Sequence, residues 1–251
     1  MGRVSLCVVA LLCIGLPAVP AGWTDVRSGL ADRDETFNYD VSWSEIVTAG
    51  RAQLRIGNAQ TASDGHTSLR MEASLRPTSL AAKMYKVAYR IENLFDATAA
   101  RPLAAAAFTS EGGVDRTRSI QFNRNGTADV ELRTQRTTRE RFVVPSGTLD
   151  VLGAVYALRT SRKAPGESLV LPVFDGVRVS TVHVTFGARK LVATGFGQLP
   201  AIEVVASLRN EASRTESGPS VRIWLSDDPM RRPLRIESAL PVGRIVLSLT
   251  K

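Results

Sequence analysis

Short segments in which apolar and polar residues alternate run from Glu35 to the end of the chain. Such alternation puts every second side chain on the same face of an extended strand, as for Phe37, Tyr39 and Val41. Turn residues separate the segments, which is typical of antiparallel sheets. The clearest further examples are KMYKVAYRIENLF (83–95), GVRVSTVHVTFG (176–187), KLVATGFGQLPAIEVVASL (190–208) and GRIVLSLT (243–250).

The pattern predicts an all-β, mainly antiparallel protein with about fourteen strands. A sheet of this size must curl or close, so we expect a strongly curved sheet or open half-barrel. The segment RSIQFNRNGTADVEL (118–132) predicts a hairpin with a two-residue turn at Asn125 and Gly126.

One segment departs from the alternation and predicts a helix over about residues 147–162. Ser146 or Thr148 is the expected cap, Asp150 lies in the first turn, and Pro165 follows the end. The apolar residues lie on nearly every side of this helix, which indicates a buried position inside the curved sheet. We expect Leu149, Leu152 and Tyr156 to form one stripe lining an apolar ligand cavity; the alternative is that they are ordinary core.

The first 21 residues have the organisation of a secretion signal. Arg3 precedes an apolar run, and Val19-Pro20-Ala21 fits a cleavage site after Ala21. The run is too short to span a membrane. We therefore expect a signal peptide at 1–21, a flexible segment at 22–34 and a single domain at 35–251, exported to the periplasm of a Gram-negative bacterium. Lipidation at Cys13 is the alternative, although Leu12 stands where a small residue is expected.

Both cysteines, Cys7 and Cys13, lie in the leader, so the mature domain has neither a disulfide nor a thiolate. The chain has a net charge of +8, and arginine supplies most of it. A basic face would suit an anionic envelope polymer. The alternative is that the charge only reflects an arginine-rich composition. Nucleic acid is not an expected partner, because no basic motif with interleaved aromatic residues is present.

Sequence signals for catalysis are weak, and we expect no enzyme activity, no cofactor and no metal. His66 and His183 are the only histidines and lack metal-ligand spacing. Neither a Gly-x-Ser-x-Gly elbow nor a phosphate-binding glycine loop is present. Asp227 and Asp228 resemble a catalytic pair, but their context predicts a hairpin turn. The residues expected to build that hairpin are Trp224, Asp227, Asp228, Arg232 and Pro233.

A basic cluster occurs in RTQRTTRER (133–141). Arg136, Arg139 and Arg141 are candidates for binding an anion, and Arg139 and Arg141 share one face of a strand. The alternative is a solvated basic loop.

Several motifs together resemble a known family. The opening FNYDVSW (37–43), the helix DVLGAVYALR (150–159), the stretches PGE (165–167) and LPVFDG (171–176), and the terminal IWLSDDPMRRPLRIESALPVG (223–243) are similar, in this order, to the bacterial exported domain-of-unknown-function family 3108. The terminal hairpin is also similar to that of periplasmic lipoprotein carriers. That likeness implies a curved sheet around a helix with an apolar cavity.

Two functions follow as expectations. The first is a periplasmic protein that binds or carries a lipid, an acyl chain or another apolar ligand. The alternative is a structural envelope protein that engages another protein or a cell-wall polymer through its basic face or a sheet edge.

Overall fold

The computed structural model describes residues 33–63, 65–84, 87–161, 163–210, 215–216, 220–240 and 243–251. The expected signal peptide at 1–21 and nearly all of the segment at 22–34 lie outside these residues. Sixteen strands of the described part belong to one sheet. They are β1 (Glu35–Trp43), β2 (Val47–Ile56), β3 (Gln60–Thr61), β4 (Thr67–Pro77), β5 (Val87–Asp96), β6 (Arg101–Glu111), β7 (Val114–Phe122), β8 (Thr127–Arg133), β9 (Thr137–Val143), β10 (Ser168–Phe174), β11 (Val179–Thr194), β12 (Gly197–Asn210), β13 (Thr215–Glu216), β14 (Val221–Ser226), β15 (Pro233–Leu240) and β16 (Gly243–Leu249).

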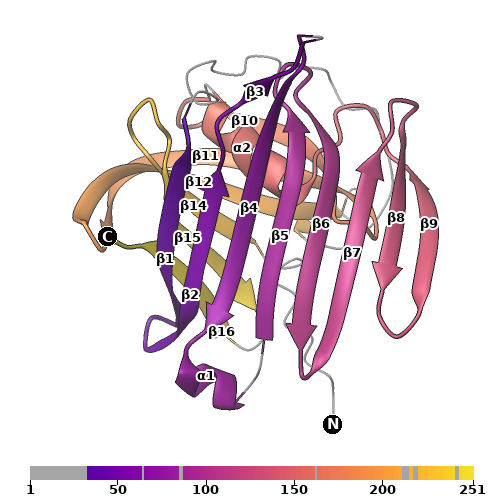
Figure 1. Ribbon diagram of the computed structural model, residues 1–251. Coiled ribbons are helices and arrows are strands. Elements are labelled where there is room, and N and C mark those ends of the chain that lie inside the picture. The colour runs from indigo at the N-terminus through magenta and orange to yellow at the C-terminus, as the bar shows by residue number, and fades with distance from the viewer. Residues whose placement is uncertain are drawn as a thin grey trace.

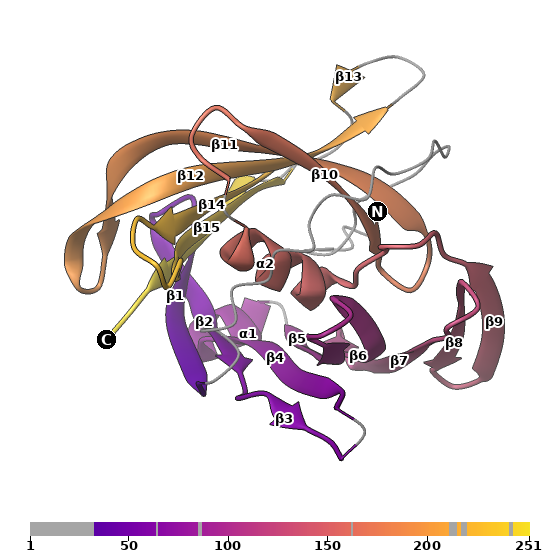
Figure 2. The same ribbon diagram turned by 90° about the horizontal axis from the view of Figure 1, so that it is seen from above.

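Fourteen of these strands form one continuous path, in the order β10-β11-β12-β14-β15-β16-β1-β2-β4-β5-β6-β7-β8-β9. All the neighbours on this path are antiparallel. The sheet bends so strongly that β1 to β9 form one wall and β10 to β16 form the other (Figure 1). Seen from above, the helix α2 (Val151–Thr160) lies between the two walls (Figure 2).

The sheet does not close, because β9 and β10 stand at the two ends of the path. Apolar side chains instead cross the open seam between β9 and β10. Phe174 at the end of β10 lies against Phe122 of β7 and Phe142 of β9, with ring centroids 6.1 and 5.2 Å apart. Side-chain packing thus joins two sheet ends that share no backbone ladder in the described part of the chain.

The core fills the space between the walls and α2. On β1, Phe37, Tyr39 and Val41 are buried while the residues between them are exposed, as the alternation predicted. Leu152 and Tyr156 of α2 belong to the same apolar cluster as Phe37 and Tyr39 of β1. Buried residues of β2, β4 and β12 complete this cluster. The predicted all-β curved sheet around one buried helix is therefore confirmed.

The helix is shorter than the predicted 147–162, because the residues before Val151 make other contacts. Gly147 has a φ of +77°. Leu149 is extended and bridges to β10: its N–H donates to the Pro172 carbonyl, and its carbonyl accepts from the Phe174 N–H. Asp150 is therefore the N-cap, and neither Ser146 nor Thr148 takes that place. The expected stripe of Leu149, Leu152 and Tyr156 is helical only from Leu152 onward.

Two further local predictions need correction. Only Gly126 has a positive φ in the β7–β8 turn, and the Asn123 N–H donates to the Thr127 carbonyl, so this loop has three residues rather than two. The strand expected from Lys83 begins at Val87, because Ser79–Met84 form the short helix α1. The total exceeds fourteen strands because β3 and β13 have only two residues each and show no alternation.

A substitution at Leu152 tests whether the helix is packed as core. Leu152 is 4% exposed, so Leu152→Ala is expected to lower the free energy of unfolding by about 2–5 kcal/mol. Leu152→Trp should also destabilise the protein, because a well-packed site has no room for the larger ring. Urea denaturation gives both values.

Leu191→Ala is the matched control. Leu191 is 66% exposed on β11, and its truncation should change stability by less than about 0.5 kcal/mol. A fully stable Leu152→Trp protein, together with a cost below about 1 kcal/mol for Leu152→Ala, would instead indicate empty space beside the helix.

Candidate functional site

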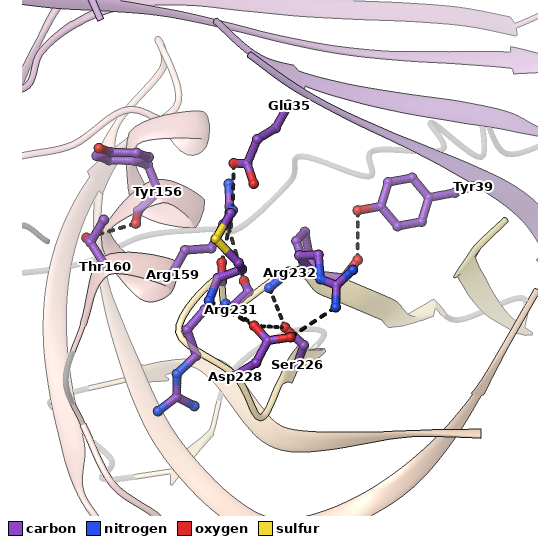
Figure 3. A network of polar contacts seen from close by, with 11 residues as sticks. Glu35, Tyr39, Tyr156, Arg159, Thr160, Ser226, Asp228, Arg231 and Arg232 are labelled. Atoms are coloured by element: carbon purple, nitrogen blue, oxygen red, sulfur yellow. Dashed lines mark hydrogen bonds and ion pairs between the residues drawn. The ribbon is translucent and has the colours of Figure 1, made fainter. Parts of the chain in front are cut away.

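The most buried charge in the described residues belongs to Arg159, near the C-terminal end of α2. Its side chain has no solvent exposure, and its Nη2 atom lies 2.7 Å from the Glu35 carboxylate at the start of β1. Its Nε donates to the Arg231 carbonyl and its Nη2 also donates to the Met230 carbonyl. The guanidinium lies over the Phe37 ring at 5.1 Å. Figure 3 shows Arg159 reaching from the helix toward Glu35 and the terminal turn.

The terminal turn between β14 and β15 is built around Asp228. Its Oδ1 accepts hydrogen bonds from the Ser226 hydroxyl and the backbone N–H groups of Met230 and Arg231. Its Oδ2 accepts from Arg232 at 3.0 Å. Burial acts to raise the pKa of Asp228, but the hydrogen bonds from Arg232 and Ser226 outweigh it and lower the pKa below its usual value. Asp228 therefore holds a turn as a carboxylate and is not poised as a general acid.

The other predicted hairpin residues also make structural contacts. Asp227 accepts from Arg189 of β11 at 2.7 Å. Pro233 begins β15, and its carbonyl accepts the Tyr39 hydroxyl hydrogen bond at 2.8 Å. Trp224 is 7% exposed and is covered by the Arg235 guanidinium. The two adjacent carboxylates thus face different partners.

Asp150 is a second buried ionisable group, at the other end of α2. Its carboxylate accepts from the Leu152 and Gly153 N–H groups and from the Asn93 side chain of β5 at 2.8 Å. Burial raises the pKa of Asp150 to about 6, although these three hydrogen bonds act to lower it. Gly153 leaves the space that this contact requires, since a Cβ there would lie 2.7 Å from the Asp150 oxygen.

The expected cavity residues are closely surrounded. Leu149 and Tyr156 have no exposure and Leu152 is 4% exposed, all within one apolar cluster. The Tyr156 ring meets Phe95 of β5 edge to face at 5.7 Å. Neither of the two large hollows described below is lined by these residues.

Both hollows involve the outer face, which we define as the exposed side chains of β1, β2 and β4 to β9 that point away from α2. Strand register aligns these side chains in rows across the sheet. One row contains Asn38, Gln53, Ser74, Arg90, Phe108, Thr117 and Arg133. The next contains Thr36, Arg55, Glu72, Glu92, Ala106, Ser119, Glu131 and Arg139.

The first hollow, called the alanine hollow, has a volume of about 830 Å³. Ala104 and Ala106 of β6 form its floor, because their small side chains leave longer neighbours standing on both sides. Its charged walls come from Arg70, Glu92, Asp129, Glu131, Arg133, Arg139 and Arg141.

The predicted anion-binding arginines divide between two places. Arg139 and Arg141 line the alanine hollow, whereas Arg136 lies in the β8–β9 turn and does not. Arg139 donates to Glu131 and Arg141 donates twice to Asp129. These arginine contacts help to lower the pKa values of both carboxylates, with Arg133 the largest cause at Glu131. An incoming anion would therefore have to displace existing partners.

The second hollow, called the arginine hollow, has a volume of about 1140 Å³ and extends from β1 to β7. Sequence reasoning missed it, because its residues come from six separate strands. Its exposed cations include Arg51 and Arg76, which lie directly opposite each other on β2 and β4. Gly195, Thr250 and Lys251 bound it on the side of β1.

Neither histidine has a metal-ligand setting. His66 Nδ1 lies 3.5 Å from Asp96, whose other oxygen caps the turn at Thr98 and Ala99. His183 lies on β11, in the other wall. Within the described ranges, no group of three or more His, Cys, Asp or Glu residues is placed to hold a metal ion. No helix in the same ranges is long and apolar enough to cross a membrane.

These features define a class of protein, an open β-barrel-like antiparallel sheet around one buried helix. The chain belongs to the family described as "Protein of unknown function (DUF3108)", whose model matches residues 38–250. The resemblance of the sequence to family 3108 is thereby confirmed. No curated protein matches the chain.

Two solved structures match the chain. One is a β-barrel-like protein of domain of unknown function DUF1849 from Brucella abortus, with a TM-score of 0.58, 10% identity, and coverage of 87% of this chain and 96% of that one. The other is a candidate exported protein with a YmcC-like fold from Bacteroides fragilis, with a TM-score of 0.35, 8% identity, and coverage of 86% and 93%. At these identities the comparison with the Brucella protein supports the fold alone.

The buried ion pair gives a first prediction for this region. Removing either charge leaves the other desolvated, so Glu35→Gln and Arg159→Met should each lower the free energy of unfolding by about 3–5 kcal/mol. The double variant should lose less than the sum, because neither charge is then left alone. Chemical denaturation of the three variants provides the cycle.

Arg189→Gln is the matched control. It breaks the ion pair between Arg189 and Asp227 of the same turn, and the Arg189 side chain is 62% exposed. Its cost should not exceed about 1 kcal/mol. Equal effects of Arg159→Met and Arg189→Gln would contradict a central role for the buried pair.

The raised pKa of Asp150 predicts a specific pH dependence. Because the folded-state pKa of about 6 lies above the ordinary 3.8, the folded protein binds more protons between these values. The contribution of Asp150 to stability therefore falls as the pH rises from about 4 to 6, by about 2–3 kcal/mol in total, and is constant above that range.

Asp150→Asn should remove this component. The stability of the wild-type protein minus that of the variant, measured by urea denaturation from pH 4 to 7, is expected to decrease with pH. A difference that is independent of pH would show that Asp150 titrates normally.

Proposed function

We propose that this protein is a non-enzymatic binding protein of the bacterial cell envelope, which holds a charged envelope partner against its outer face. The observation that carries the proposal is the contrast between the two sides of the β1–β9 wall. The helix side is filled by apolar side chains, whereas the other side has two large hollows with charged residues among their lining.

The composition of the hollows supports a charged partner. Both arginine and carboxylate side chains line the two hollows, and the small residues Ala104 and Ala106 form the floor of the alanine hollow. A surface of this kind recognises a partner through charge-assisted hydrogen bonds rather than through apolar burial. The organisation of the first 21 residues as a secretion signal supports a location in the envelope.

The lipid-carrier hypothesis needs room for an apolar chain beside α2. Leu149, Leu152 and Tyr156 would have to line that room, but each is at most 4% exposed within a continuous core. Packing of this density leaves the outer face as the better supported binding surface.

Envelope binding with blocked hollows tests the proposal. Ala106→Trp fills the alanine hollow, and Ser74→Trp obstructs the arginine hollow; both positions point away from the core. The wild-type protein should cosediment with purified Gram-negative cell envelopes in a salt-sensitive manner. At least one of these variants should reduce binding about tenfold or more, which corresponds to about 1.4 kcal/mol.

Thr185→Trp is the control, because Thr185 is exposed on β11 in the opposite wall and lines neither hollow. It should bind like the wild type. Retained binding by both hollow variants would overturn the proposal. Native mass spectrometry of protein purified from the periplasm should show the polypeptide mass alone, and a bound lipid would restore the carrier hypothesis.

A further inference from the structure

The arginine hollow contains an unusual pair of like charges. Arg51 of β2 and Arg76 of β4 are direct cross-strand partners, and both are exposed. Like charges placed directly opposite each other destabilise a sheet. Asp40 approaches Arg51 only to 3.9 Å, and the Arg51 side chain remains 87% exposed. No ion pair joins Arg76 to any residue in the described ranges. A bound anion between the two guanidinium groups would remove this repulsion.

Beside this pair runs a row of neutral hydrogen-bonding groups. Asn38, Gln53 and Ser74 are consecutive cross-strand partners, and Thr117 continues the row beyond Arg90 and Phe108. The Gln53 amide donates to the Asn38 carbonyl oxygen, which leaves the Asn38 amide nitrogen and the Gln53 oxygen for another partner. Such mixed donors and acceptors match hydroxyl groups, which both donate and accept.

The length of the row favours a polymer over a small anion. It crosses six strands, and at about 4.8 Å between neighbouring strands it spans about 24 Å. The row also includes an apolar contact surface at Phe108, over which the Arg90 guanidinium lies at 5.2 Å.

The acids in the hollow restrict the charge density of that polymer. Asp40, Glu72 and Asp115 lie among the cations Arg51, Arg76, Arg90 and Lys251. A chain with a negative charge on every unit would be repelled at these carboxylates. A chain in which charged and neutral units alternate would meet cations and hydrogen-bonding groups in turn.

We infer that the arginine hollow binds an anionic glycan whose charges are separated by neutral sugar units. The inference rests on the proposed function and specifies the chemistry of the partner. An anionic group of the glycan lies between Arg51 and Arg76, and its hydroxyl groups meet the row from Asn38 to Thr117.

Three probes separate the sources of affinity in titration calorimetry. Hyaluronan oligosaccharides carry a carboxylate on every second sugar and should bind. Neutral dextran of the same length lacks the charge. Polyphosphate has a charge on every unit but no sugars. The affinity for hyaluronan should exceed that for each of the other two by at least about tenfold.

Two variants assign the binding to the hollow. Arg51→Gln/Arg76→Gln should weaken hyaluronan binding about tenfold or more, whereas the charge-matched Arg124→Gln/Arg136→Gln, in the turns after β7 and β8, should change it less than about twofold. Gln53→Leu keeps the charge and should weaken hyaluronan binding severalfold without affecting polyphosphate. The substituted positions are on the surface, and a midpoint of thermal unfolding no lower than that of the wild type would verify that each variant is folded.

Each other outcome overturns the inference. Equal or tighter binding of polyphosphate would indicate attraction by charge alone, and equal binding of dextran would remove the role of the arginine pair. Absence of hyaluronan binding, or an undiminished affinity of the Arg51→Gln/Arg76→Gln protein, would exclude this glycan site. The proposed function would still hold in that case if the protein bound whole envelopes in a salt-sensitive manner and Ala106→Trp abolished this binding. The outer face would then bind a different charged partner.

Discussion

The interaction on which the arrangement of the molecule depends is the desolvated guanidinium of Arg159. A cation without solvent exposure needs every available partner, and Arg159 takes them from Glu35, from the carbonyls of Met230 and Arg231, and from the ring of Phe37. These partners come from the first strand and the last long turn, and Arg159 itself lies on the helix. One side chain therefore fixes how the two walls of the sheet meet the helix, and Asp228 keeps the turn in the shape that presents its carbonyls.

This arrangement has a consequence for function. The walls close on α2 with apolar side chains, and Phe174 bridges the seam that the sheet leaves open. Binding capacity is then left to the outer face, where strand register brings residues from distant parts of the chain into rows. The alanines of β6 lower the surface at one place, and the arginines of β2 and β4 give it unbalanced charge at another.

Membership of a family without an assigned activity makes the physical chemistry of the site more informative than the relationships. The fold shared with the Brucella protein says how the chain is built. Function has to be inferred from the chemistry of particular side chains. Here the opposed pair of Arg51 and Arg76 is the most specific indication of a binding site, since the sheet gains no stability from this pair.

The sequence by itself determined the strands, the hairpin around Asp227 and Asp228, and the presence of a buried helix. Each depends on local periodicity or turn chemistry, which acts over a few residues. The tertiary structure decided that Leu149 pairs with β10 rather than joining the helix, that Asp150 is desolvated beside Asn93, and that Arg159 meets Glu35. It also decided which exposed residues form the two hollows. Those outcomes depend on pairing between segments far apart in the chain, and alternation tells which face a residue takes but not which strand will lie beside it.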